Sequence, residues 1–562
     1  MVKSGLIYHD EFSASIDYAG RQGASLRAWF VKGTPYQSFY VTQGCPILST
    51  IHAILEVVRF PDNRRLLVRL NNGQHWSIFT EVPVFWEQSG NQLHTTGVFS
   101  GYLRLAYVPD DVQQNFHTLT QYSTCVPVGG RVIYEMDLEY LRIQYNFMTY
   151  GEGRLLMLTL PHHREVLENP RYIHLPGLSC IKGVMGAIEG NTWFAREPLV
   201  KTGWFSGQPI DRKFLDRIEA NLEKDVKTHH HSPAPDPYFF GKGVAKMARL
   251  ALIAEQIGRS ELIAEVVGNL KRALEPWLTG GNRNPLVYDL TWKGIVSMQG
   301  LGDRGADFGN GWYNDHHYHY GYFIYAIAVV GRYDRGWLDA YRVPILAILK
   351  DYANPFHEDP MFPRFRHKDV YDGHSWASGL FEFADARNQE STSEAVNAYY
   401  AVYLLGLAWE DRDLQEAGQF LLSTELRSSR VYWQMGESSE IYDPRFKANK
   451  CVGIVWGCKV DYVTWFGDLP EYMHCIQYLP FTPITPLLLT PSWIHEQTGI
   501  LERVLARKDP IVEPKWVAYI LMALGIVDKD KASGRMLEVT EFDDGNTATN
   551  SWYWLATCGP CQ

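Results

Sequence analysis

The hydrophobic pattern of this chain changes its period near Pro209, and the change divides the chain into two kinds of structure. Before it lie short runs of alternating apolar residues, such as Arg65–Leu70, Gly101–Tyr107 and Arg131–Met136, separated by Asn-Gly, Pro-Asp and Gly-Gly turns. Alternation interrupted by turn residues is typical of strands with one buried face. Many short strands of this kind predict a β-sandwich over residues 1–195, with a start that looks short.

After Pro209 the apolar residues recur at helical spacing. We expect a charged amphipathic helix over Asp211–Lys227, then a solvated His- and Pro-rich loop that includes His229–His231. Further helical patterns cover residues 241–258, 260–278, 316–331, 336–352, 392–409, 412–425, 491–507 and 515–526. Successive amphipathic helices without a fixed repeat length favour helix pairs closed into an (α/α) barrel, with an open solenoid as the alternative.

The composition indicates a large core and a neutral ligand. Hydrophobic residues make up 46% of the 562 residues and charged residues 21%, which argues against extensive disorder. The net charge of −10 argues against nucleic acid as a partner, because phosphates favour a basic surface. The 18 Trp and 33 Tyr offer flat apolar surfaces with polar ends, which suit uncharged sugar rings, although most of them are expected in the core.

The sequence carries no visible targeting signal. Its start lacks an apolar run, no segment has the length of a membrane span, and no Asn-x-Ser/Thr site occurs. We therefore expect no membrane contact and a cytoplasmic location by default, or a secreted or wall-associated form if a leader is missing. The eight Cys are too scattered for a disulfide framework, and Cys558–Cys561 has no following helix that would lower a thiol pKa.

Two short segments place ionisable groups four residues apart among aromatic residues. Asp307–Tyr320 contains Asp315 and His319, and Gln389–Tyr400 contains Glu390 and Glu394. Residues at i and i+4 share one face of a helix. Two carboxyl groups can exchange the protons of glycoside hydrolysis while aromatic faces hold the sugar, so the pattern fits cleavage of a sugar polymer.

Helix rules offer a structural alternative for both segments. Asp315 suits an N-cap, and Ser391 with Glu394 matches a capping box, in which the Glu side chain returns to the N–H of the cap residue. The His-rich run contains metal-ligand types, but only Asp315 and His319 share a face, so we expect no metal. From helix rules alone, structure and chemistry are equally good explanations of these carboxylates.

Seven segments of the chain stand out together: Asp236–Lys242, Asp307–Asn310, Tyr313–Phe323, Asp372–Gly379, Gln389–Tyr400, Lys459–Gly467 and Asp544–Ser551. They closely resemble glycoside hydrolase family 81, the endo-β-1,3-glucanases, over roughly residues 195–557. The β-rich first part resembles the family more loosely. The resemblance implies a β-sandwich at residues 1–195, a small α/β linking domain at 196–240 and a C-terminal (α/α)6 barrel at 241–562.

The resemblance also implies an activity, namely inverting hydrolysis of internal β-1,3 bonds in laminarin-like glucans, with no cofactor or metal. At matching positions, Asp315 resembles the general acid, Glu390 the general base, Glu394 a second essential carboxylate, and His319 the residue that pairs with the acid. A glucan-binding receptor or lectin on the same scaffold is the alternative, and a hydrolase of another linkage is a third. We expect a monomer.

The inverting mechanism sets physical requirements for the site. Its two carboxyl groups stand about 6.5–9.5 Å apart, which leaves room for a water. Asp315 must stay protonated, and Trp312, Tyr313 and Tyr320 are expected to supply an apolar wall. Glu390 must stay ionised, which solvent contact and a helix start would favour. We expect the sugar to contact a set of six residues: Trp312, Tyr313, Tyr320, His374, Trp376 and Asp461.

Overall fold

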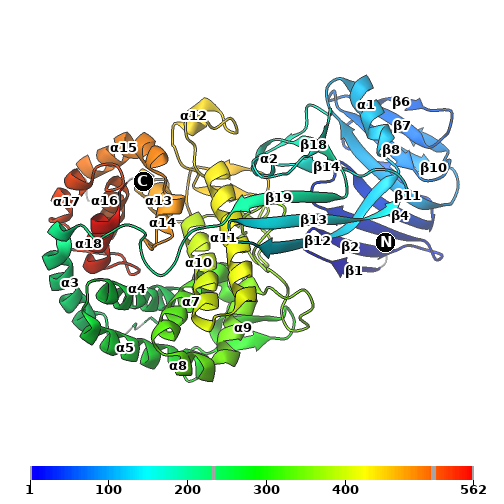
Figure 1. Cartoon of the computed structure of the whole chain (residues 1–562). Helices are drawn as coiled ribbons and strands as arrows, with labels where there is room; N and C mark the ends of the chain where they lie inside the picture. Colours follow the sequence, from blue (N-terminus) through cyan, green and yellow to red (C-terminus); the bar gives the residue numbers. More distant parts are fainter. Residues whose placement is uncertain (1–2, 231, 233, 508–513, 560–562) are drawn as a thin grey trace. The chain divides into compact units, whose positions relative to one another are not determined.

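The computed structural model describes residues 3–230, 232, 234–507 and 514–559. The chain forms two compact units, residues 1–197 and residues 198–562 (Figure 1). His231 of the expected loop and Cys561 of the terminal cysteine pair lie outside the described residues. Strands dominate the first unit and helices the second, which confirms the predicted change of structure along the chain.

The first unit is built from antiparallel sheets. Its largest sheet has eight strands in the order β1-β2-β3-β4-β11-β8-β7-β6. These strands are β1 (Lys3–His9), β2 (Ser13–Ala19), β3 (Ser25–Val31), β4 (Gln37–Gly44), β6 (Ile54–Arg59), β7 (Arg65–Leu70), β8 (His75–Thr80) and β11 (Phe99–Val108). One three-stranded sheet contains β5 (Ile47–Ser49), β9 (Trp86–Ser89) and β10 (Gln92–Thr95), and a second contains β12 (Cys125–Met136), β13 (Tyr140–Gly151) and β19 (Thr192–Pro198). A third contains β14 (Leu156–Thr159), β15 (Arg171–Ile173) and β18 (Gly186–Glu189). Strands β16 (Ser179–Cys180) and β17 (Gly183–Val184) form a two-stranded sheet. Helices α1 (Val112–Gln121) and α2 (Pro161–Arg164) complete the unit.

The large sheet has a hydrophobic core on each face. Successive strand residues point to opposite faces, so Ile78 and Phe79 of β8 belong to different cores. Ile78 packs in a cluster that includes Trp86 of β9, whereas Phe79 packs in a cluster that includes Phe116 of α1. The alternation that identified these strands in the sequence therefore reflects packing layers on both sides.

The second unit contains the long helices. They are α3 (Leu215–Thr228), α4 (Pro237–Gln256), α5 (Ser260–Thr279), α7 (His316–Tyr333), α8 (Arg335–Ala340), α9 (Arg342–Ala353), α10 (Thr392–Trp409), α11 (Arg412–Tyr432), α15 (Pro491–Ala506), α16 (Val517–Leu524), α17 (Lys529–Met536) and α18 (Ala548–Thr557). Shorter helices are α6 (Met298–Gly302), α12 (Pro444–Lys447), α13 (Pro470–Cys475), α14 (Thr485–Leu488), η1 (Arg212–Phe214), η2 (Ala306–Trp312) and η3 (Pro514–Trp516). Two small antiparallel sheets use β20 (Leu286–Asp289) with β21 (Gly294–Ser297), and β22 (Asn388–Gln389) with β23 (Ile454–Trp456) and β24 (Val460–Asp461).

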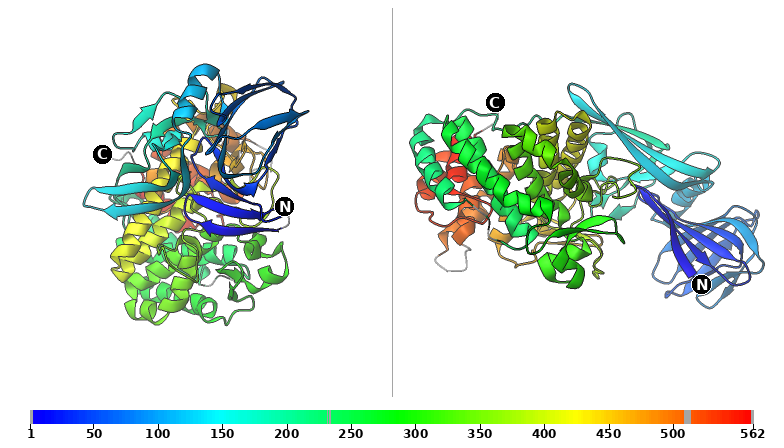
Figure 2. Two further views of the ribbon diagram at one scale, coloured as in Figure 1. Left: turned by 90° about the vertical axis from the view of Figure 1, so that its right-hand side faces the viewer. Right: turned by 90° about the horizontal axis from the view of Figure 1, so that it is seen from below.

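Helices α7 and α10 form the centre of the second unit. Nearly all their side chains are buried, and the two helices contact each other. They lie side by side in Figure 1, and the green and yellow helices remain adjacent in both views of Figure 2. Gly321 of α7 faces Ala398 of α10, where an added Cβ would come within 2.5 Å of the Ala398 Cβ. The absence of a side chain at Gly321 allows this close approach.

Most predicted helices are confirmed, with differences at their ends. The predicted helix over 336–352 is two helices, α8 and α9, separated at Tyr341. Pro344 explains the break, because a continuous helix would bring its ring against the carbonyl of Ala340, whereas the first turn of α9 accepts it. Helix α11 continues to Tyr432, beyond the predicted end, and the pattern at 515–526 corresponds to η3 followed by α16.

The predicted linking region, residues 196–240, does not separate as a unit of its own. From Pro198 onward the chain belongs to the helical unit, and the described residues between 199 and 240 contain no strand. Phe214 of η1 packs on Trp552 of α18 with ring centroids 5.9 Å apart, and α3 contacts both α18 and α4. The amphipathic face of α3 is thus buried against the helices that follow it.

No helix in the described part of the chain has both the length and the apolar character needed to cross a membrane.

Two glycine substitutions, one at the contact between α7 and α10 and one away from it, should have opposite effects on the free energy of unfolding. Gly321→Ala should destabilise the protein by about 1–3 kcal/mol, because the new methyl group has no space beside Ala398. Gly268→Ala, in the middle of α5, should stabilise it by about 0.5–1 kcal/mol, since an added Cβ finds its nearest neighbour, Arg272, at 3.6 Å. Thermal unfolding of both variants measures the difference. Equal melting temperatures would mean that α7 and α10 do not need the glycine.

Candidate active site

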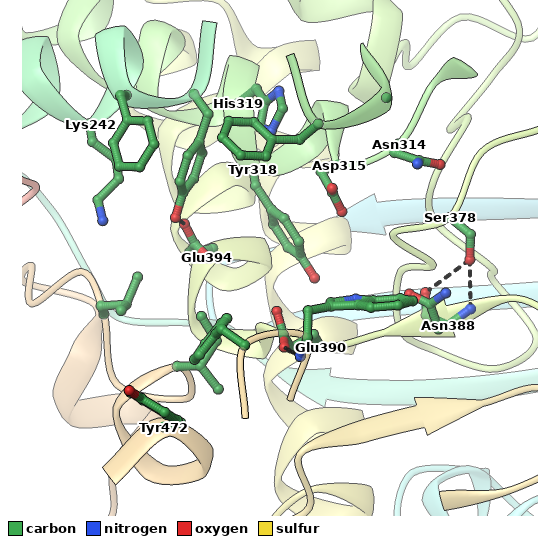
Figure 3. Close-up of a pocket in the computed structure, with 18 of the residues that line it drawn as sticks. Lys242, Asn314, Asp315, Tyr318, His319, Ser378, Asn388, Glu390, Glu394 and Tyr472 are labelled. Atoms are coloured by element: carbon green, nitrogen blue, oxygen red, sulfur yellow. Dashed lines mark hydrogen bonds between the residues drawn. The ribbon is translucent and has the colours of Figure 1, made fainter. Parts of the chain in front are cut away.

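A cavity of about 730 Å³ in the second unit is lined by the ionisable groups of both predicted segments: Asp315, His319, Glu390 and Glu394. In Figure 3 the Asp315 and Glu390 carboxyl groups enter from opposite sides, and Glu394 lies on the side of Lys242. The cavity is rich in aromatic side chains, namely Tyr238, Phe239, Phe308, Tyr318, Phe381, Phe383, Trp465, Phe466, Tyr472 and Trp516. Two segments separated by some seventy residues in the chain therefore supply one cavity.

Asp315 immediately precedes α7 but does not cap it with its side chain. Its backbone is left-handed (φ 60°, ψ 16°), and within the described structure its carboxyl group accepts no hydrogen bond from the helix. The backbone is held by the Asp315 N–H, which donates to the Ala377 carbonyl at 2.8 Å, and by Asn314, whose Oδ1 accepts from the Gly379 N–H at 2.8 Å. Asp315 therefore occupies the N-cap position, as the helix rules predict, but its carboxyl group makes no capping bond and faces the cavity.

Glu390 lies between strand β22 and the start of α10. Its Oε1 accepts a hydrogen bond from the Trp465 N–H at 2.8 Å, and its carbonyl accepts one from Gln477 Nε2 at 2.6 Å. The residue is 8% exposed, so the expected solvent contact is small. The Trp465 N–H, rather than solvent, is the group that stabilises a negative charge on Glu390.

Glu394 forms only half of the predicted capping box. Ser391 Oγ accepts from the Glu394 N–H at 3.4 Å, but the Ser391 N–H donates to the Tyr318 hydroxyl at 3.1 Å instead of to Glu394. The Glu394 carboxylate accepts hydrogen bonds from the hydroxyl groups of Tyr322 at 2.8 Å and Tyr238 at 3.0 Å. Its side chain therefore belongs to the cavity wall and not to the helix cap.

A buried ion pair lies beside Glu394. Lys242 Nζ is 2.8 Å from Asp543 Oδ1, and both side chains are buried. Burial alone would lower the pKa of Lys242, but Asp543 and then Glu394 raise it, so the ammonium group stays charged. Asp543 also accepts from the Tyr519 hydroxyl at 2.9 Å and the Gly545 N–H at 2.9 Å. One fixed cation is thus placed among carboxylates that would otherwise repel one another.

Three of the carboxyl groups that line the cavity, Asp315, Glu390 and Glu394, resist ionisation. Burial, and then the charge of Glu394, raise the pKa of Asp315 to about 8. Burial also raises the pKa of Glu390 to about 8. The hydrogen bond from the Trp465 N–H opposes this shift, and the negative charges of Asp315 and Glu394 add to it. The pKa of Glu394 is raised by burial and lowered by Lys242 and its hydroxyl donors. Lys242 and the hydroxyl donors therefore favour ionisation of Glu394 over that of Asp315 and Glu390.

His319 lines the cavity without pairing with Asp315. No hydrogen bond joins their side chains in the structure as described, and His319 Nδ1 has no partner among those residues. Its ring packs on Tyr238 and Phe308, with centroids 5.2 Å and 6.2 Å away. Burial lowers the pKa of His319 well below its usual value. The imidazole is neutral, and the expected pairing of His319 with the acid has no side-chain hydrogen bond to support it among the described residues.

Four residues expected to touch the sugar are instead buried behind the cavity wall. Tyr320 donates its hydroxyl proton to the Ile295 carbonyl at 2.8 Å, and Tyr313 donates to Asp289 at 2.9 Å. Trp376 donates to Asp369 at 3.3 Å, and His374 is fully buried. None of the four belongs to the lining of the described cavity, which corrects their assignment as contact residues. Tyr313 and Tyr320 likewise do not provide the wall around Asp315.

The other two expected contact residues lie near the cavity without lining it. Trp312 is half-buried and packs on Phe381 with ring centroids 5.5 Å apart, while the Arg304 guanidinium lies over both rings. Asp461 pairs with Lys459 at 3.0 Å. Trp312 therefore supports Phe381 and Arg304, which do line the cavity.

Sequence reasoning missed the groups that hold Glu394 and Glu390 in place. Tyr238 and Lys242 lie within the segment Asp236–Lys242, and the signal that could have identified them is Lys242, because a lysine in the buried part of helix α4 requires a partner. The Trp465 N–H has no sequence signal, because it is a backbone group. The described residues contain no group of three His, Cys, Asp or Glu side chains placed to hold a metal ion.

Comparison with known proteins places both units in one family. The description "Glycosyl hydrolase family 81 C-terminal domain" matches residues 210–555, and "Glycosyl hydrolase family 81 N-terminal domain" matches residues 4–206. The chain belongs to glycosyl hydrolase family 81. This family 81 protein also resembles the solved structure of a glycoside hydrolase family 81 mutant from Clostridium thermocellum, with a TM-score of 0.88 and 25% identity over 98% of this chain and 77% of that one.

Curated relatives of this family 81 protein come from plants, fungi and bacteria. It is 34% identical to a glucan endo-1,3-beta-D-glucosidase of Glycine max, over 97% of this chain and 83% of the relative. It is 28% identical to the primary septum glucan endo-1,3-beta-D-glucosidase of Schizosaccharomyces pombe, over 98% of this chain and 56% of that protein. The chain thus spans most of the plant relative and little more than half of the fungal one.

The raised pKa of Asp315 predicts a pH-dependent gain of stability in Asp315→Asn. At pH values below the usual carboxyl pKa, Asp315 is protonated in both the folded and the unfolded wild type, so it does not lower the free energy of unfolding. As the pH rises toward about 8, the unfolded chain releases the proton while the folded chain keeps it, and wild type loses stability. The Asn variant should become more stable than wild type by up to about 1.4 kcal/mol per pH unit across this window. Calorimetry at pH 4 and pH 8 measures the difference; equal gains at both would contradict the raised pKa.

Proposed function

We propose that this family 81 protein is an endo-acting hydrolase of internal β-1,3-glucosidic bonds in laminarin-like glucans. The observation that carries the proposal is that Asp315 and Glu390 enter one aromatic-lined cavity from opposite sides, with different hydrogen-bond environments. The names of the relatives, which act on 1,3-β-glucan, support the linkage. A cavity of about 730 Å³ with many aromatic side chains suits several sugar rings of a neutral chain.

We infer that the helical unit is an (α/α)6 barrel and that the first unit is a β-sandwich. Contacts of α4 with α7, α7 with α10, α16 with α18, and α18 with α4 support an inner ring. Their sequence neighbours α5, α11, α15 and α3 contact α4, α10, α16 and α18, as the outer members of helix pairs would. Several of these outer helices follow a curved rim in Figure 1. The two cores on either face of the large sheet support the layered first unit.

Asp315 acts as the general acid in this proposal. It gives its proton to the glycosidic oxygen while the bond from that oxygen to the anomeric carbon breaks. Its half-buried carboxyl group, which accepts no hydrogen bond in the described structure and lies in the field of Glu394, keeps the proton to about pH 8. An acid of this kind is protonated at neutral pH and still strong enough to donate.

Glu390 acts as the general base. It takes a proton from a water whose oxygen bonds to the anomeric carbon on the face opposite the leaving oxygen, so the configuration inverts from β to α. The Trp465 N–H at 2.8 Å favours the ionised form of Glu390 over that of Asp315. Asp315 accepts no such bond in the described structure, so this donor is the difference between the hydrogen-bond environments of two carboxyl groups whose pKa values both rise to about 8.

Glu394 supplies the fixed negative charge of the site. Two tyrosine hydroxyl groups and the nearby Lys242 ammonium favour its ionised form. Its charge raises the pKa of Asp315 and so keeps the acid protonated. We propose that Glu394 acts through Asp315 rather than through a covalent step.

Incubation with laminarin tests the proposed function. Wild type should release oligosaccharides of intermediate size, whose new reducing ends are first observed as the α anomer by NMR. Asp315→Asn should reduce kcat at least 10²-fold, with laminarin binding largely kept, because the Asn side chain matches the Asp in size but cannot donate the acid proton. Glu390→Ala should be similarly slow and should regain turnover with azide, which needs no base.

Three results would contradict this proposal. Binding of laminarin by wild type without sugar release would favour a glucan-binding receptor. Release from cellulose or lichenan in preference to laminarin would reject the linkage. Normal turnover in Asp315→Asn would remove Asp315 from the acid role.

The coupling between Glu394 and Asp315 predicts a change in the pH profile. In Glu394→Gln the negative charge that raises the Asp315 pKa is absent. The acid then loses its proton at lower pH, and the alkaline limb of kcat/KM should move toward lower pH by about one unit. Glu265→Gln, at an exposed position of α5, is the matched control and should leave the limb in place. An unchanged limb in Glu394→Gln would separate Glu394 from the acid.

A further inference from the structure

Phe308 combines two properties that are each unfavourable for phenylalanine. Its backbone is left-handed (φ 62°, ψ 27°), a conformation that brings Cβ close to a carbonyl oxygen and that bulky residues avoid. Its side chain is 52% exposed, so burial does not compensate for the strain. A glycine would fit this backbone better, and a polar residue would fit this exposure better.

The backbone around Phe308 is fixed from both sides. Asp307 (φ 50°) and Gly309 (φ 81°) are also left-handed, so three successive residues share the conformation. Asn284 Nδ2 donates to Asp307 Oδ2 at 2.7 Å. A Cβ on Gly309 would lie 2.6 Å from Asn314 Nδ2, so this glycine is needed for the close approach. The turn is therefore held in place by its neighbours, and the Phe308 side chain is not what holds it.

The Phe308 ring is oriented by aromatic neighbours on the cavity wall. It meets Tyr238 and Phe239 at steep angles, with centroids 5.8 Å and 5.9 Å away, and His319 at 6.2 Å. Such edge contacts orient a ring without covering both of its faces. Phe308 lines the same cavity as Asp315, so its exposed half is available to whatever occupies that cavity.

Folding alone gives no reason for an exposed, strained phenylalanine in the lining of this cavity. Backbone strain of this kind persists where function requires it. The apolar C–H face of a pyranose packs on an aromatic ring, and an exposed ring with fixed orientation is suited to that contact.

We propose that Phe308 is a stacking surface for a glucosyl ring bound beside Asp315, and that it sets how the glycosidic oxygen meets the acid. The inference rests on the proposed function, because it assumes a glucan in the cavity. It assigns to Phe308 a substrate contact that the spacing of the carboxylates does not reveal.

Three variants test the inference with laminarin kinetics and thermal unfolding. Phe308→Gly removes the ring and relieves the strain, so it should raise KM about tenfold while the melting temperature stays the same or rises. Phe308→Leu keeps apolar bulk without a flat ring and should also raise KM. Phe308→Tyr keeps the ring and should retain the wild-type KM. Glu410→Gly is the matched control: Glu410 is exposed and left-handed (φ 53°) at the end of α10, so it should gain stability with unchanged KM.

The outcomes separate this inference from the proposed function. A wild-type KM in Phe308→Gly overturns the stacking role while wild-type activity still supports the glucanase. If Phe308→Gly lowers the melting temperature and Phe308→Leu has the wild-type KM, the ring has a packing role, and the stacking inference is overturned as well. If wild type releases no sugar from laminarin, both the function and the inference fail.

Discussion

The close contact of α7 with α10 is the constraint on which the site depends. Asp315 directly precedes α7, and Glu390 lies two residues before α10. Because Gly321 meets Ala398 without an intervening side chain, the starts of the two helices reach the same cavity. Each helix is buried along nearly its whole length, so neither can shift without exposing apolar surface. The positions of the two carboxyl groups are therefore set by core packing, not by flexible loops.

Placing Asp315, Glu390 and Glu394 among the largely apolar walls of one cavity opposes folding, and the unit contains specific groups that limit this cost. Lys242 supplies a cation, Tyr238 and Tyr322 donate to Glu394, and the Trp465 N–H donates to Glu390. Asp315 alone receives none of this help within the described structure. Asp315 has the fewest stabilising partners and is also the residue that must keep its proton. The lack of donors lowers the stability of the fold, and it also favours the protonated form that the acid role requires.

The sequence identified the carboxylates but not the contact surface, and the reason is physical. The i, i+4 spacing of Asp315 with His319 and of Glu390 with Glu394 pointed to the right residues, although Asp315 and Glu390 each lie just before a helix and do not share a helix face with their partners. Burial is not local: α7 is buried on nearly all sides, so no periodicity separates Tyr320, which packs behind the wall, from Tyr318, which lines the cavity. The break at Tyr341 was readable from Pro344, whereas the Trp465 N–H depends on a chain segment whose position only tertiary structure determines. The β-rich and helical halves were both predictable, since each follows from a repeating pattern.

Strained backbone conformations are concentrated in the segment that precedes α7 and contains the proposed acid. Asp307, Phe308, Tyr313 and Asp315 are all left-handed non-glycine residues within one short stretch before α7. At about 1–2 kcal/mol each, their combined strain is a large fraction of a typical folding free energy. The stretch is held because its polar groups are bonded to the core: His316 bridges Asp351 and the Asn310 carbonyl at 2.6 Å and 2.7 Å, and Tyr313 donates to Asp289. The strained turn places the Asp315 carboxyl group in the cavity, and the buried His316–Asp351 pair ties the residue that follows Asp315 to the core.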